Sequence, residues 1–154
     1  MKTIISIDPG ISGAVCIWRG GVPTVEDMPT MKRGKASVID VANLAHIIGG
    51  IDGPVDVIIE DVTARPGNGS VSMFSFGRNV GRIEAVPMAL GYAVRYVRPV
   101  VWKRGVGLPV GATKEQSRSM AIERFPALAG DLRRKKDEGR AESVLIGAWA
   151  MGTK

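Results

Sequence analysis

Four acidic residues stand where their carboxylates could converge on one site. Asp8 follows an apolar run at a glycine turn, and Glu60 closes the apolar run V-D-V-I-I-E. Glu138 and Glu142 are four apart on a predicted helix, so they share one face. Carboxylates are the hard ligands of Mg²⁺ and Mn²⁺, and two such ions roughly 4 Å apart can activate water against a phosphodiester. The set therefore predicts a two-metal hydrolytic site.

Each of these acidic residues also has an ordinary structural explanation. Asp8 fits a common Asp-Pro-Gly turn, and Glu60 could simply begin a polar loop. Acidic residues near a helix start, such as Glu138, are favoured by the helix dipole. Asp137 competes with Glu138 as a ligand, but it lies five residues from Glu142, off that face, and suits an N-cap. We favour Glu138, and the choice between the two stays open.

Basic and aromatic residues predict a polyanionic partner. The net charge of +6 and the pI near 9.8 attract nucleic acid first and an anionic membrane surface second. Phe74 and Phe76 could each stack on an unpaired base, at roughly 1–3 kcal/mol per base, or could belong to the core. The candidate DNA-contacting cations, which could equally form a solvated basic face, are Arg78, Arg82, Lys103, Lys114 and Arg118.

Composition narrows the class of protein. A chain of 154 residues with 45% hydrophobic content suits one domain spanning 1–154. Cys16 is the only cysteine, which excludes an internal disulfide or a cysteine-rich zinc site and favours a reducing cytoplasm. No apolar run reaches the roughly 18 residues of a membrane span. His46, the only histidine, is far in sequence from every acidic residue and is expected to be structural.

The apolar patterns predict elements that would position these residues. Strands are expected within 3–28, with turns at Asp8 and at Gly20-Gly21, and again over 54–61 and 92–97. Helical spacing extends over 37–51 from Val38 to Ile48, over 73–91 with a bend near Pro87, and over 138–151. Residues 63–72 are predicted to form a mobile loop, and 98–112 a basic loop or short helix.

Two further details complete the predicted layout. Thr113 is expected to cap a helix over 114–125, with Gln116 as its capping-box partner, and the last helix is expected to bury Trp149. Hairpin-joined strands followed by strand–helix alternation indicate an α/β domain, with a mixed sheet covered by helices on both faces.

Several segments together resemble the motifs of RuvC-like Holliday-junction resolvases, most closely their phage-encoded branch. They are IDPGISGA, IIEDVTARPGNG with MFSFGRNVGRIEA, WKRGVGL with KEQSRSMAIERF, and EGRAESVLIGAWA. The resemblance spans nearly the whole chain. It implies a ribonuclease H-like fold with a mixed five-stranded sheet, a homodimer, and magnesium-dependent nicking of branched DNA, with manganese as a possible substitute and no small-molecule cofactor.

The resemblance also assigns roles to individual residues. Asp8 matches the first-strand aspartate, Glu60 the glutamate that ends the fourth strand, and Glu142 the last acidic ligand. Lysines near Lys103 and Lys114 approach phosphates in that family, and Lys114 is our first choice for stabilising transition-state charge. The chain departs from the bacterial pattern of two aspartates three apart, because Gly139 stands three residues before Glu142.

Three functions remain in competition. The first is a junction-cleaving endonuclease acting in a bacterial or infected host cytoplasm. The second is a catalytically silent DNA-binding protein of the same fold, which would tolerate loss of an acidic residue. The third is a phosphotransferase of the actin and sugar-kinase kind, for which this chain is short, because such proteins generally place nucleotide between two domains.

Overall fold

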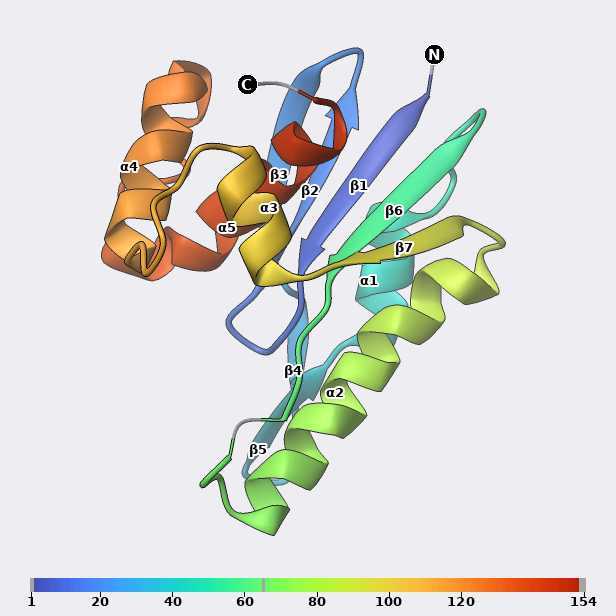
Figure 1. Cartoon of the computed structure of the whole chain (residues 1–154). Coiled ribbons are helices and arrows are strands. Elements are labelled where there is room, and N and C mark those ends of the chain that lie inside the picture. The colour runs from blue at the N-terminus through green and yellow to red at the C-terminus, as the bar shows by residue number, and fades with distance from the viewer. Residues whose placement is uncertain (1, 65, 153–154) are drawn as a thin grey trace.

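The computed structural model describes residues 2–64 and 66–152, and its centre is a mixed five-stranded sheet in the order β3-β2-β1-β6-β7 (Figure 1). The strands are β1 (Thr3–Asp8), β2 (Ala14–Arg19), β3 (Val22–Asp27), β6 (Val55–Glu60) and β7 (Ala93–Val97). The first three form an antiparallel meander, while β6 and β7 run parallel to β1. The predicted mixed sheet is confirmed.

The central strands β1 and β6 bring two acidic positions to one edge of the sheet. Both strands are almost wholly buried, as β-branched runs between helical layers should be. In the parallel register Ile7 pairs with Ile59, so Asp8 and Glu60 follow side by side at the carboxyl ends. Ligand sites of open α/β sheets form at this edge.

Helices cover both faces of the sheet, as predicted. One layer contains α3 (Pro99–Gly105), α4 (Lys114–Arg124) and α5 (Glu138–Ala150), and the other contains α1 (Val41–Ile48) and α2 (Ser70–Ala89) (Figure 1). Short 3₁₀ turns, Pro126–Leu128 and Lys135–Asp137, join α4 to α5. Two apolar clusters fill the space between layers and sheet, one around Trp18, Trp102 and Leu145 and the other around Ile7 and Ile83.

The prediction of one helix over 37–51 is wrong in its first part. Val38 lies in β5 (Ala36–Ile39), which pairs antiparallel with β4 (Thr30–Arg33) in a separate hairpin. The helix begins only after Asp40, whose side chain accepts a hydrogen bond from the Asn43 backbone N–H at 3.0 Å. Val38 and Ile39 are β-branched and fit an extended strand, and Asp40 was the available N-cap signal.

Other predicted boundaries move less. The loop after β6 ends earlier than expected because α2 starts at Ser70, and α2 runs through Pro87 to end two residues later. Thr113 caps α4 with Gln116 in a reciprocal capping box, as predicted. Trp149 is only half-buried, contrary to expectation, because it sits in the last turn of α5 with its ring against the backbone of Gly105.

Cys16 is fully buried in β2 as a small core residue, and burial raises the pKa of its thiol. Among the helices of residues 2–64 and 66–152, none is both long and apolar enough to cross a membrane.

Candidate active site

Three of the four predicted acidic residues meet in one cavity of about 530 Å³ at the carboxyl ends of β1 and β6. Asp8, Glu60 and Glu142 line it together with Lys103 and Lys114. They come from two strands and three helices far apart in sequence. The fold therefore gathers carboxylates and cations at a single open site.

The turn after Asp8 requires glycine at a specific position. A Cβ on Gly13 would overlap the carbonyl oxygen of Asp8, because the chain folds back tightly between β1 and β2. The Gly13 N–H donates to the Gly10 carbonyl at 3.1 Å, which closes this turn. Asp8 is thereby held on a rigid corner with its side chain in the cavity.

Glu60 is buried, 8% exposed, and is oriented by a tryptophan. The indole Nε1 of Trp102, which is fully buried in α3, donates to Glu60 Oε1 at 2.8 Å. Burial raises the pKa of Glu60, and Glu142 raises it further, whereas the Trp102 hydrogen bond and two lysines oppose the rise. The hydrogen bond fixes one carboxylate oxygen.

Glu142 reaches the cavity from the buried middle of α5 and is 5% exposed. Its Oε1 lies 3.5 Å from Lys103 Nζ and accepts no hydrogen bond from the described residues. A buried carboxylate oxygen without a hydrogen-bond donor is costly unless a cation compensates it. This oxygen has capacity left for a ligand.

The electrostatics of the site are those of a crowded set of carboxylates. Burial raises the pKa of Asp8 well above its ordinary range, and Glu142 and then Glu60 add to the rise. Lys114 and Lys103 lower the pKa of Asp8 only in part. Like charges held this close favour a bound cation, because the alternative is protonation of one member.

The donor set fits a hard divalent cation. Mg²⁺ and Mn²⁺ take carboxylate oxygens as ligands, and three rigid elements supply such oxygens here. One of these oxygens, Glu142 Oε1, has no hydrogen-bond partner in the described residues. Within 2–64 and 66–152, however, no three His, Cys, Asp or Glu side chains are already gathered around one point at ion-binding spacing. The chemistry of the residues fits, and their side chains would have to close around an ion.

Asp137 and Glu138 occupy different environments. Asp137 is 1% exposed, and its carboxylate accepts hydrogen bonds from the Arg134 backbone and guanidinium, the shortest at 2.7 Å. Glu138 is half-buried, with Oε2 at 3.9 Å from Lys114 Nζ at the side of the cavity. Asp137 is thus occupied by its neighbour, while Glu138 lies next to a lysine of the cavity without lining it.

Gly139, the departure from the bacterial pattern, is where α5 approaches the β1–β2 turn most closely. A Cβ at this position would lie 2.5 Å from the Ser12 carbonyl oxygen and 3.2 Å from Asp8 Oδ2. Any larger residue would push α5 away from the turn. The helix can therefore sit against Asp8 only because this residue has no side chain.

The other predicted DNA-contacting residues are distributed over several surfaces. Lys103 and Lys114 line the cavity, whereas Arg78 and Arg82 line a second cavity. The Arg118 guanidinium pairs with Glu115 and donates to the backbone carbonyls of residues 132 and 133. The structure does not bring Arg118 to the cavity that Asp8 lines.

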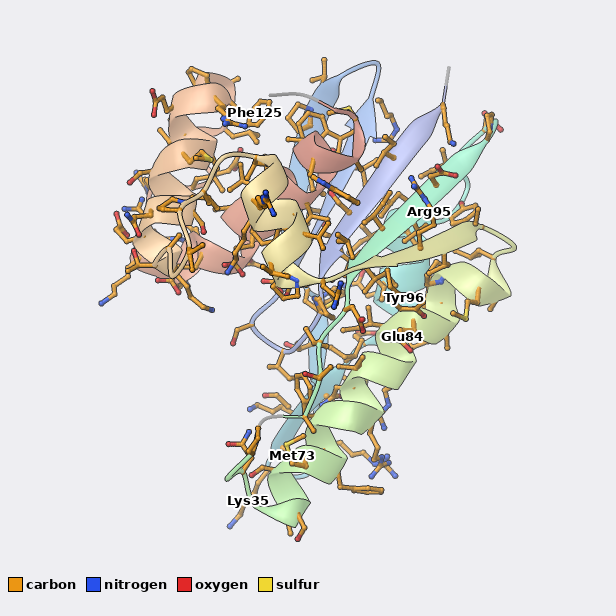
Figure 2. The ribbon with its side chains drawn as sticks, in the orientation of Figure 1. Lys35, Met73, Glu84, Arg95, Tyr96 and Phe125 are labelled. Carbon is orange, nitrogen blue, oxygen red and sulfur yellow. The ribbon has the colours of Figure 1, made fainter. Side chains whose placement is uncertain are left out.

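The two phenylalanines are likewise separated. Phe76 lines the cavity with Asp8, beside Met73, and Figure 2 shows Met73 on the first turns of α2. Phe74 is 66% exposed, with the Arg78 guanidinium 5.3 Å from its ring centroid. His46 is exposed on α1 and does not line the cavity.

Trp102 is the residue that sequence reasoning missed. The only signal in the sequence was a tryptophan within a short basic segment. Such a residue is of interest because the N–H of a buried indole usually needs a hydrogen-bond acceptor. Nothing in the spacing between 60 and 102 identifies Glu60 as that acceptor.

Sequence comparison relates this chain to a described protein. No family model matches the chain. It is 27% identical over 156 residues to a protein of Chlamydomonas reinhardtii described as the chloroplastic Holliday junction resolvase MOC1. That alignment covers 90% of this chain but only 17% of the length of the algal protein.

Two solved structures share the architecture over nearly their whole length. Thermus thermophilus RuvC aligns with a TM-score of 0.57 at 17% identity, covering 98% of this chain and 97% of RuvC. RuvC in complex with a Holliday junction substrate aligns with a TM-score of 0.57 at 16% identity, covering 99% and 98% of the two chains. The chain has the RuvC fold, which confirms the predicted RuvC-like resemblance, while membership of the phage-encoded branch stays a prediction.

Proposed function

We propose that this chain, which has the RuvC fold, is a structure-selective endonuclease that cuts branched DNA such as Holliday junctions with two divalent cations. The observation that carries the proposal is the convergence of Asp8, Glu60 and Glu142 in one cavity with Lys103 and Lys114. The similarity to a protein described as a Holliday junction resolvase supports the choice of substrate.

Within this cavity each residue has a separate task. Asp8, Glu60 and Glu142 would hold the ions, with Glu138 as the candidate fourth ligand. When bound, Mg²⁺ or Mn²⁺ supplies Lewis-acid activation of the attacking water and of the leaving 3′ oxygen. Lys114 places a positive charge where the phosphoryl oxygens gain charge. It is the better candidate because it is the more exposed of the two lysines and lies 3.9 Å from Glu138, whereas Lys103 lies 3.5 Å from the buried Glu142.

The proposed reaction is hydrolysis of a phosphodiester. The water oxygen loses a proton to solvent as it forms a bond to phosphorus, and the bond from phosphorus to the 3′ oxygen breaks. The 3′ oxygen takes up a proton, and the products carry a 5′-phosphate and a 3′-hydroxyl. Phe76, in the wall of the cavity, would hold an unpaired base beside the strand being cut.

Branched DNA is the proposed substrate because a crossing point bends and opens more cheaply than a linear duplex. A symmetric homodimer would place one such cavity on each of the two strands that must be cut to resolve a junction. The fold of RuvC bound to a Holliday junction substrate supports this assignment.

A cleavage assay tests the proposal. A labelled four-way junction and a linear duplex of the same sequence are incubated with wild-type protein and no metal, with Mg²⁺, with Mn²⁺, or with Ca²⁺. We expect cutting of the junction only in Mg²⁺ or Mn²⁺, and loss of cutting in Glu60→Gln. Glu26→Gln is the matched control, because Glu26 is an exposed strand glutamate without an ion pair in the described residues, and it should cut like wild type.

Two results would overturn the proposal. Undiminished cutting by Glu60→Gln would remove the carboxylate set from the chemistry. Tight junction binding by wild type without cutting in Mg²⁺ or Mn²⁺ would instead indicate the catalytically silent DNA-binding alternative.

The role of Phe76 is tested against Phe74. Both are phenylalanines at the start of α2, but only Phe76 lines the cavity. Phe76→Ala should slow junction cutting by roughly tenfold or more, the equivalent of removing one base stack. Phe74→Ala should cut within a few-fold of wild type, and the reverse order would contradict the assignment.

A further inference from the structure

A second cavity, of about 340 Å³, lies between the β4–β5 hairpin and α2. Its lining includes three arginines, Arg33 from the hairpin and Arg78 and Arg82 from α2, together with Ser75 and Asn79. The hairpin runs beside the first half of α2, beyond the edge of the main sheet, and Figure 2 labels Lys35 at this end of the molecule. We call this cavity the arginine groove.

Two of the arginines in the groove are held in place. Asn79 is 5% exposed, and its Oδ1 accepts from the Ile39 backbone N–H at 3.2 Å and from Arg82 at 3.1 Å. The Arg78 guanidinium lies over the ring of Phe74. The same Asn79 oxygen therefore joins the hairpin to α2 and holds the Arg82 guanidinium. Because Arg82 is already held, its side chain loses less entropy when a ligand binds.

The positive charge of the groove is not neutralised. In residues 2–64 and 66–152, no carboxylate lies within 4.0 Å of the three groove arginines, nor of Lys32 and Lys35 in the same hairpin. Guanidinium groups in fixed positions match the paired oxygens of phosphates. The ligand expected here therefore carries several anionic oxygens.

The groove is on the other side of α2 from the catalytic cavity. Met73 and Phe76 line the catalytic cavity, while Ser75, Arg78 and Arg82 line the groove. At about 100° per residue these two sets point in different directions from one helix. A phosphate in the groove cannot be the phosphate that is cut.

We propose that the arginine groove binds the phosphodiester backbone of a duplex arm away from the cutting site, so that the β4–β5 hairpin is a second DNA-binding element. This inference rests on the proposed function, because it assumes that branched DNA is the substrate. The groove shares α2 with the catalytic cavity, so one strand can lie in the cavity while a neighbouring arm passes along the hairpin. Repulsion among the five cations is relieved by a polyanion.

Equilibrium binding of four-way junctions tests this site without cleavage. Dissociation constants are measured in a chelator over a range of salt concentrations, using junctions with long arms and with arms cut short. Arg33→Gln should flatten the plot of log affinity against log salt by about 0.9 for each phosphate that the variant no longer neutralises. Arg33→Gln should also bind long-armed junctions more weakly than wild type does, and it should bind short-armed junctions as wild type does.

Arg19→Gln is the matched control, since Arg19 is an exposed arginine at the end of β2 without an ion pair in the described part of the chain. It should bind both junctions like wild type. Arg33→Lys, which keeps the charge, should restore most of the salt dependence and shows that weaker binding by Arg33→Gln is not a folding defect.

Three results would overturn the inference. The first is an Arg33→Gln variant that matches Arg19→Gln in affinity and salt dependence, and the second is one that binds long and short arms equally weakly. The third is a change in sedimentation from dimer to monomer in Arg33→Gln, which would assign the groove to a second copy of the chain. If wild type neither binds nor cuts junctions, the proposed function fails first; if wild type cuts them and Arg33→Gln binds normally, only the groove assignment fails.

Discussion

The indole N–H of Trp102 donates to Glu60 Oε1 at 2.8 Å across the carboxyl edge of the sheet. Trp102 is fully buried and Glu60 nearly so, and the two residues come from α3 and β6. The hydrogen bond favours the charged form of Glu60 in surroundings whose burial favours the neutral form. Trp102 is thus a positioning residue that favours the ionised form of a proposed ligand and orients its carboxylate.

Trp102→Phe should therefore weaken cation binding and impair cutting most at acidic pH. Removing the donor raises the pKa of Glu60 further, so the carboxylate is protonated over more of the acid range and the acid limb of the pH–rate profile moves to higher pH. A hydrogen bond to a charged group contributes roughly 1.5–3 kcal/mol, which corresponds to about tenfold or more in affinity. Calorimetric titration with Mn²⁺ and the pH profile of junction cutting measure both effects.

Trp18→Phe is the control for that substitution. Trp18 is as buried as Trp102, but its Nε1 has no hydrogen-bond partner in the described residues. The same chemical change should lower stability through packing alone and leave the pH profile in place. Equal shifts of the profile in both variants would show that the Trp102 hydrogen bond has no specific effect.

Asp8→Asn should make the metal-free protein more stable at neutral pH. The pKa of Asp8 is raised in the folded state, so its contribution to stability is complete below the ordinary carboxyl pKa of about 3.9 and is lost as pH rises through the folded value. As pH rises, the wild type must either ionise Asp8 beside Glu142 and Glu60 or keep a proton that a free carboxyl group would have released. We expect Asp8→Asn to gain about 0.5–2 kcal/mol there.

Urea unfolding in a chelator at pH 5 and pH 8 measures this difference. The advantage of Asp8→Asn should shrink toward pH 5 and should also shrink when Mg²⁺ is added, because an ion bound to the folded wild type stabilises it. An Asp8→Asn variant less stable than wild type at pH 8 would contradict the expected repulsion.

The strands of the sheet could be predicted from the sequence, because it contains apolar, β-branched runs that end at turns or at acidic residues. It was also sufficient for the Thr113 cap, where the signal is local. It failed at the β4–β5 hairpin, since Val38 and Ile39 suit a strand as well as one side of a helix. Asp40 marks only where a helix can begin, and pairing with residues 30–33 makes 36–39 a strand. Alternation over four residues is too short to reveal such a pairing.

The site was predictable in its acidic members and not in its geometry. Strand ends placed Asp8 beside Glu60, and helical spacing placed Glu142. The hydrogen bond between Trp102 and Glu60 spans 42 positions and depends on how α3 packs, which no local pattern contains. The separation of Phe74 from Phe76 likewise depended on the rotation of α2 relative to the cavity.

Gly139→Ala should destabilise the protein, although alanine is the better helix former. The added Cβ would stand 2.5 Å from the Ser12 carbonyl oxygen, and backbone cannot move aside cheaply. We expect a loss of about 1–3 kcal/mol by thermal or urea unfolding. Gly81→Ala in α2 is the control, because nothing lies within 4 Å of its Cβ, and it should gain about 0.5–1 kcal/mol. Gly139→Asp, which restores the bacterial spacing, should be no more stable than Gly139→Ala.

Glu138→Gln and Asp137→Asn separate the two candidates for the fourth ligand. Glu138 lies at the side of the cavity beside Lys114, so its neutralisation should weaken Mn²⁺ binding by calorimetry while leaving the unfolding temperature close to wild type. Asp137 is buried against Arg134, so Asp137→Asn should lower stability by roughly 1–3 kcal/mol and leave ion affinity unchanged. Loss of ion affinity in a folded Asp137→Asn, with none in Glu138→Gln, would reverse the assignment. Unchanged affinity in both variants would reduce the ligand set to Asp8, Glu60 and Glu142.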